Sequence, residues 1–232
     1  MKHLYLNLKR FDVPVEFGGV NRIAPVQEWG KYIVEHTQQG LKHYDPAEVE
    51  FVQYFPEAHI LGAVAARCEG SPVQVGCQSV YRMNTAVGGN FGAFTTNRPA
   101  SIAKAMGCAS TIIGHCEERN DKAGILAEAG VSDTAAVNRL LNQEIKLAIE
   151  QGLTVLYCIG EKSEERSSGS RYWAISFPSA LQGWTPPRWS SPTSRSGPSA
   201  RARPRPTSPI SPRSPALSRS APGAFPWCTA AG

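Results

Sequence analysis

Acidic residues, lysine and asparagine are absent from the chain after Arg166, where there are instead eight arginines and many serines and prolines. Of the 24 lysines and arginines in the chain, 16 lie in the part up to Arg166, which also contains all 19 acidic residues. The formal net charge of +5 therefore belongs to the tail, and the body is mildly acidic, as is usual for a soluble domain.

Two further absences narrow the class of protein. No apolar run approaches the roughly 20 residues that span a bilayer, and no basic-then-apolar leader opens the chain. The six cysteines show neither CxxC spacing nor a paired framework, which favours reduced thiols over disulfides. We therefore expect a cytoplasmic protein with no membrane span, no metal ion and no cofactor. The cysteines are Cys68, Cys77, Cys108, Cys116, Cys158 and Cys228.

Short apolar stretches alternate with amphipathic segments up to Arg166. The apolar stretches predict strands at residues 3–7, 49–54, 73–77, 111–114 and 154–158. Between them, residues 26–44 place Trp29, Ile33 and Val34 on one helical face, and residues 133–151 predict a helix that Asp133 caps and Gly152 ends. Such alternation predicts an α/β fold with a parallel sheet and right-handed crossovers.

The richest stretch in chemical terms is STIIGHCEER, at residues 110–119. Its apolar residues form the predicted fourth strand, Gly114 permits a tight turn, and His115 follows at the strand's carboxyl end, beside a charged helix. In a barrel of alternating strands and helices, that end carries the catalytic groups.

Four segments, taken together and in order, resemble the triosephosphate isomerase family. STIIGHCEER is similar to the family's fourth strand, with its GHSER pattern. The other three are similar to its first strand with NxK, its third strand and following loop, and its fifth strand with CIGE. They are LYLNLK at residues 4–9, VGCQSVY at 75–81 with FGAFTTN at 91–97, and LTVLYCIGEKSEER at 153–166.

The resemblance implies a (β/α)8 barrel, which needs eight units and roughly 250 residues. Only about five units are found, so we expect an incomplete TIM barrel over residues 1–168. Residues 169–232 form a Ser/Pro/Arg-rich tail with a proline every few residues and no periodic apolar face, and we expect this tail to be disordered.

Codon arithmetic offers an origin for the tail. In a frame displaced by one base, the codons of residues 193–200 can read YEPVWAIG, the family's strand-six motif, which contains its catalytic glutamate. Residues 184–192 can likewise read VDTAKVVIA, and residues 224–231 can read LPVVYGGG, which resembles the family's strand-eight phosphate-binding end. We therefore expect a frameshift between Ser167 and Tyr172. The chain as written then lacks the glutamate.

The alternative is a genuine tail that binds nucleic acid or an SH3-like partner through its arginines and prolines. Eight arginines without acidic residues would bind phosphate weakly and with strong salt dependence. We regard nucleic-acid binding as the weaker interpretation.

The resemblance also implies an activity, the interconversion of glyceraldehyde 3-phosphate and dihydroxyacetone phosphate. It implies a catalytic role for His115, which polarises the carbonyl oxygen, and for Lys9, whose ammonium group also binds substrate. Asn7 positions the substrate, and Glu117 supports the site by pairing with Lys9. The small phosphorylated sugar is the expected ligand, and the long loop after the third strand implies a homodimer for the intact form.

Some features depart from the family pattern. The loops at residues 10–25 and 82–97 look longer than usual, and GHCEER carries Cys116 and Glu118 where the family has serine and arginine. Glu118 places a negative charge near an anionic substrate. A divergent isomerase of another small phosphoketose is therefore a second hypothesis.

Overall fold

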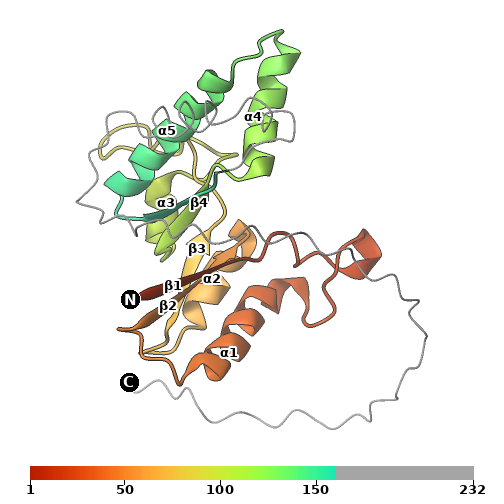
Figure 1. The fold of residues 1–232 in the computed structure, drawn as a ribbon, viewed down its shortest axis with the longest axis vertical. Coiled ribbons are helices and arrows are strands. Elements are labelled where there is room, and N and C mark those ends of the chain that lie inside the picture. The colour runs from red at the N-terminus through yellow and green to blue at the C-terminus, as the bar shows by residue number, and fades with distance from the viewer. Residues whose placement is uncertain (160–232) are drawn as a thin grey trace, which may run out of the picture. The chain divides into compact units, whose positions relative to one another are not determined.

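The computed structural model describes residues 1–159, which form a single parallel sheet covered by helices (Figure 1). The strands follow one another in chain order across the sheet, as successive right-handed βα units would place them. Their bounds are β1 Lys2–Asn7, β2 Val49–Phe55, β3 Val73–Cys77, β4 Ser110–Ile113 and β5 Thr154–Tyr157. All five predicted strands are thus confirmed, to within two residues at each end.

The pairing between neighbouring strands is uneven along the sheet. β1 pairs with β2 over its whole length, from Lys2 opposite Val49 to Asn7 opposite Tyr54. β3 and β4 share only two paired positions, of which the last is Cys77 opposite Thr111. Since the strands are parallel and in register, their carboxyl ends meet along one edge, where the candidate site residues lie.

Five helices connect the strands, with 3-10 turns at Val15–Phe17 and Val26–Glu28 before the first. Their bounds are α1 Trp29–Leu41, α2 Glu57–Ala65, α3 Ala100–Ala105, α4 Cys116–Glu128 and α5 Thr134–Glu150. None of the helices described is long and apolar enough to cross a membrane.

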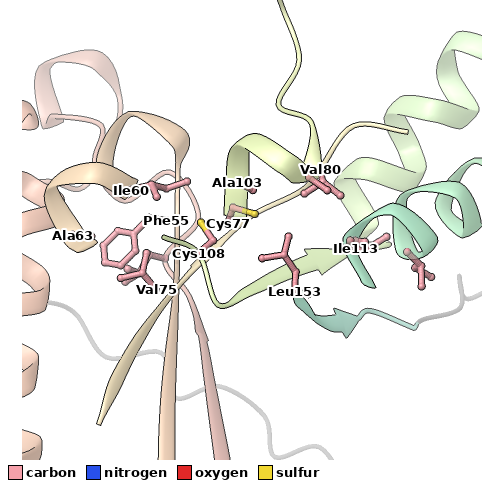
Figure 2. Close-up of a cluster of buried hydrophobic side chains, with 14 of the residues drawn as sticks. Phe55, Ile60, Ala63, Val75, Cys77, Val80, Ala103, Cys108, Ile113 and Leu153 are labelled. Atoms are coloured by element: carbon pink, nitrogen blue, oxygen red, sulfur yellow. The ribbon is translucent and has the colours of Figure 1, made fainter. Parts of the chain in front are cut away.

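The main core lies between the helices and one face of the sheet. Figure 2 shows Phe55 and Val75 of the sheet beside Ile60 of α2, and Ile113 beside Leu153 further along. These side chains are at most 4% exposed. Burial of such side chains stabilises a fold by roughly 1.5–3 kcal/mol each before the entropy of ordering is subtracted.

The other face of the sheet carries a smaller cluster. Val52, Tyr54 and Ile112 form it, and the hydroxyl groups of Tyr54 and Ser110 lie 2.8 Å apart. Gly76 makes room for the Tyr54 ring, because a β-carbon at that position would lie 2.5 Å from it. In a closed barrel this face is the interior.

The two helices predicted in detail fare differently. The helix predicted at residues 133–151 is confirmed as α5. The Asp133 carboxylate accepts the N–H of Ala136 at 3.0 Å, and Gly152 follows the helix with φ 69°. The prediction of one helix over residues 26–44 is wrong at both ends. Pro25 leads into a 3-10 turn before α1, and the helix stops at Leu41, ahead of Pro46.

The incomplete barrel is confirmed within residues 1–159 as five parallel strands, the first four of which are each followed by one or two helices. Predictions for residues 160–232, including the tail and its origin, lie outside the described residues.

Candidate active site

The turn after β1 carries Asn7 and Lys9, the first two predicted site residues. The Lys9 N–H donates to Oδ1 of Asn7 at 2.9 Å, which closes an Asx turn. Lys9 has φ 46°, in the left-handed region that a lysine adopts only when its surroundings hold it there. The turn therefore fixes where the lysine side chain leaves the backbone.

Gln78, the first residue after β3, contacts this turn. Its Nε2 lies 2.9 Å from the Lys9 carbonyl oxygen, 3.2 Å from Oδ1 of Asn7 and 3.3 Å from the Tyr54 carbonyl oxygen. One side-chain amide thereby joins the carboxyl ends of β1, β2 and β3.

His115 follows β4 and forms the N-terminal cap position of α4. Its side chain is 25% exposed, and its Nδ1 lies 3.6 Å from the carboxylate of Glu117. The thiol of Cys116 is 3.9 Å from the same nitrogen. The ring is therefore accessible at the edge of the sheet, next to a carboxylate.

The structure places Glu117 beside His115, with its side chain 82% exposed. None of the ion pairs within residues 1–159 joins it to Lys9. Its support of Lys9 stays a prediction.

Gly114, just before His115, has no room for a side chain. Its φ is 81°, and a β-carbon there would lie 2.9 Å from the Tyr157 ring and 3.0 Å from the Cys158 carbonyl oxygen. Arg119 stabilises the same turn, because its Nε donates to the Gly114 carbonyl oxygen at 2.8 Å. A terminal guanidinium nitrogen of Arg119 also donates to the Tyr157 hydroxyl at 2.7 Å. The start of α4 is thereby held against β5.

Glu118 lies almost buried behind this turn, with 12% of its side chain exposed. One carboxylate oxygen accepts the N–H of Gly114 at 2.6 Å, and the other accepts the Ser79 hydroxyl and the Lys122 ammonium, each at 2.9 Å. The negative charge expected near the substrate is thus largely taken up by these three donors.

Lys122 also contacts Glu144 of α5, 3.0 Å away. Burial first, and then the charge of Glu118, raise the pKa of Glu144 to about 8. Burial also raises the pKa of Glu118, but the Lys122 charge and the hydrogen bonds from Glu144, Lys122 and Gly114 outweigh it and lower the net pKa. Near neutral pH the group therefore holds one carboxylate, one ammonium and one protonated carboxyl, with no net charge.

Lys9 and His115 thus lie at the same edge of the sheet, one after β1 and the other after β4. Half-buried side chains hold the backbone at each, Asn7 and Gln78 at Lys9 and Glu118 and Arg119 before His115. Residues 1–159 contain no cluster of three or more His, Cys, Asp or Glu side chains that could hold a metal ion.

A family model described as triosephosphate isomerase matches residues 26–180. The chain belongs to the triosephosphate isomerase family. The matched segment includes His115 and Glu117, whereas Asn7 and Lys9 precede it.

Individual relatives agree with this assignment. The triosephosphate isomerase of Syntrophotalea carbinolica is 32% identical over 112 residues, which are 48% of this chain and 37% of the relative. That of Lactobacillus delbrueckii subsp. bulgaricus is 31% identical over 143 residues, or 61% of this chain and 49% of the relative. The chain therefore spans less than half the length of these relatives.

A solved structure supports the fold. The triosephosphate isomerase of Bartonella henselae superposes with a TM-score of 0.54 at 19% identity, over 79% of this chain and 63% of the other.

Sequence reasoning missed the roles of Gln78, Ser79, Glu118 and Arg119. Gln78 and Ser79 directly follow the predicted third strand, and that position at the carboxyl end of a strand was the available signal. Glu118 and Arg119 also have partners 39 residues away in the chain, Ser79 and Cys158, for which there was no local signal.

Proposed function

We propose that the chain derives from an enzyme that interconverts dihydroxyacetone phosphate and glyceraldehyde 3-phosphate in glycolysis and gluconeogenesis. The observation that carries the proposal is the placement of His115 at the start of α4, on the same sheet edge as the Lys9 turn, in a chain of this family. The proposal includes a cytoplasmic location. It also includes a homodimer for the intact form, because the long loop after β3 resembles the family's loop that contacts the partner subunit.

The proposed reaction moves one proton between adjacent carbons. A carboxylate removes a proton from the carbon next to the carbonyl, an enediolate forms, and a proton returns to the neighbouring carbon. The imidazole of His115 hydrogen-bonds to the oxygens on which negative charge develops. The Lys9 ammonium stabilises the same charge and binds the anionic substrate, while Asn7 orients it.

The chain as written lacks the carboxylate that would act as base. By the codon arithmetic, that glutamate falls across the codons of Thr193 and Ser194 in a displaced frame. A positioned base contributes about 10²- to 10⁴-fold to the rate of such a step. We therefore expect no isomerase activity from the chain as written.

A nucleotide sequence and a repair experiment test the proposal. A single-base insertion or deletion between the codons of Ser167 and Tyr172 is expected, with the strand-six motif in the other frame. The repaired gene should give a soluble dimer that interconverts triose phosphates, measured in a coupled assay in both directions. A folded, repaired dimer that does not interconvert triose phosphates would contradict the proposed activity, and an intact reading frame without the strand-six motif in another frame would contradict the proposed origin of the tail.

The departures from the family pattern support a second candidate, an isomerase of another small phosphoketose. Glu118 replaces an arginine, and residues 10–25 form a long loop directly after Lys9. The repaired enzyme would then turn over a different phosphoketose with a higher kcat/KM than dihydroxyacetone phosphate. Parallel assays on both substrates distinguish the candidates.

A further inference from the structure

Two consecutive side chains at the carboxyl end of β3 reach opposite parts of the candidate site. Gln78 contacts the turn after β1, and Ser79 contacts α4 through Glu118. β3 is the central strand of the five described, so this pair lies between the Lys9 side and the His115 side.

The contact of Gln78 acts on the backbone conformation of Lys9. The left-handed φ of Lys9 is held by the hydrogen bond from its N–H to Asn7, and Gln78 donates both to that same Asn7 oxygen and to the Lys9 carbonyl oxygen. The side-chain amide of Gln78 carries two hydrogens, and three acceptors lie within 3.3 Å of its nitrogen, so all of its donor capacity is used. Without it, the oxygens of the turn lose their shared donor.

The contact of Ser79 acts on the turn before His115. Its hydroxyl donates to the Glu118 carboxylate, whose other oxygen accepts the Gly114 N–H at 2.6 Å. Ser79 is itself held, because Arg98 donates to its carbonyl oxygen and also pairs with Glu57. The hydroxyl therefore steadies the carboxylate that fixes the start of α4.

We propose that Gln78 and Ser79 are positioning residues, which set the Lys9 turn and the His115 helix so that both groups face one small phosphorylated molecule. The inference rests on the proposed function, since only a shared ligand requires the two groups to be held in one arrangement. Neither residue is proposed to touch the reacting atoms.

Amide hydrogen exchange, measured by NMR on the full chain, tests the anchoring. Gln78→Leu should speed exchange at the Lys9 N–H about 10-fold and leave the Gly114 N–H unchanged, since one net hydrogen bond is lost. Ser79→Ala should do the reverse, while Ser79→Thr, which keeps the hydroxyl, should resemble the wild type. Ser101→Ala is the control, because its hydroxyl bonds to Thr85 away from the site.

A binding measurement tests the purpose of the anchoring. The probe is 2-phosphoglycolate, a small phosphorylated carboxylate, titrated into the repaired, full-length enzyme, because by the proposed function the chain as written lacks the strand-eight phosphate-binding end. Gln78→Leu and Ser79→Ala should each raise its Kd about 10-fold while lowering the thermal midpoint by only about 2–4 °C, and Ser79→Thr should bind as the wild type does.

The outcomes separate the two proposals. If the repaired enzyme without a further substitution does not bind the probe but exchange responds in the selective pattern, the proposed function fails and the anchoring stands. Exchange that changes at neither amide, or equally at both in each variant, overturns the positioning proposal. So does an unchanged Kd in both variants of a wild type that binds.

Discussion

The imidazole Nε2 of His59 lies 3.0 Å from a carboxylate oxygen of Asp12, and both side chains are 2% exposed. This pair ties the long loop that follows Lys9 to helix α2. Asn21 reinforces the loop, because its side-chain amide donates to the carbonyl oxygens of Asp12 and Ala24. The loop next to the candidate site is thus anchored by buried polar contacts rather than by its apolar residues.

Replacing Asp12 by Ala should lower the free energy of unfolding by about 1–3 kcal/mol, because it leaves the buried Nε2 of His59 without its hydrogen-bond partner. Arg10 contacts the same Asp12 oxygen at 2.8 Å, but its side chain is 65% exposed. Arg10→Ala should therefore cost at most about 1 kcal/mol and serves as the matched control. Urea unfolding of both variants measures the difference, and equal losses would contradict the role given to the buried pair.

The raised pKa of Glu144 predicts how stability depends on pH. The group titrates near 4.5 when free and at about 8 in the folded chain. Between these values the folded state keeps a proton that the unfolded state has lost, so stability falls as pH rises through that window. Two other groups affect stability outside this pH window. The pKa of Glu118 is lowered, so Glu118 changes stability only at more acidic pH. The pKa of Lys122 is raised, because the charges of Glu144 and Glu118 outweigh the effect of burial, so Lys122 changes stability only at more alkaline pH.

Glu144→Gln should therefore flatten the pH dependence, since the amide is neutral throughout. We expect the thermal midpoint of the wild type to fall by several degrees from pH 6 to pH 9 and that of the variant to fall less. Glu150→Gln, on the exposed side of the same helix, should keep the wild-type slope. Parallel slopes for all three proteins would show that Glu144 carries its charge at neutral pH.

Much of the fold could be predicted from the sequence because its signals are local. Each strand is a short apolar run, and Asp133 and Gly152 mark the ends of α5 with ordinary capping chemistry. α2 and α3 were not located, since they are nine and six residues long and show little contrast between faces. Short helices depend on packing more than on their own periodicity.

In the candidate site, too, the residues with a local signal could be predicted and the long-range contacts could not. His115 and Lys9 were found because each directly follows a strand in a recognisable segment. The contact between Gln78 and Lys9 joins residues 69 apart, and the one between Glu118 and Ser79 joins residues 39 apart. Such contacts follow from the register of the strands, which an apolar run does not specify.

The exposed face of β1 predicts self-association of the chain as written. Within residues 1–159, β1 pairs with β2 alone, and Leu4 and Leu6 on one of its faces are 49% and 52% exposed. An open apolar edge strand is a template for pairing with another chain. Replacing both leucines by lysine should lower the apparent mass in light scattering.

Leu61→Lys supplies the control for that experiment, because Leu61 is 62% exposed on α2 and not on an edge strand. It should leave the apparent mass unchanged. If it lowers the mass as far as the β1 variant does, added charge and not the strand edge governs the association.

The roles of Lys9 and His115 are separable in the repaired, full-length enzyme. His115→Gln should lower kcat about 10²- to 10³-fold with a small change in KM, because it weakens a donor to the charge that develops in the transition state. Lys9→Met should raise KM and lower kcat together, because its charge meets both the substrate and the enediolate. Lys104→Met is the control, since the Lys104 ammonium group donates to the Gly152 carbonyl oxygen before β5, at the opposite end of the sheet.

Steady-state kinetics in both directions measure the effects on kcat and KM separately. A His115→Gln variant with wild-type kcat would remove the imidazole from the mechanism, and a Lys9→Met variant with unchanged KM would remove the lysine from substrate binding.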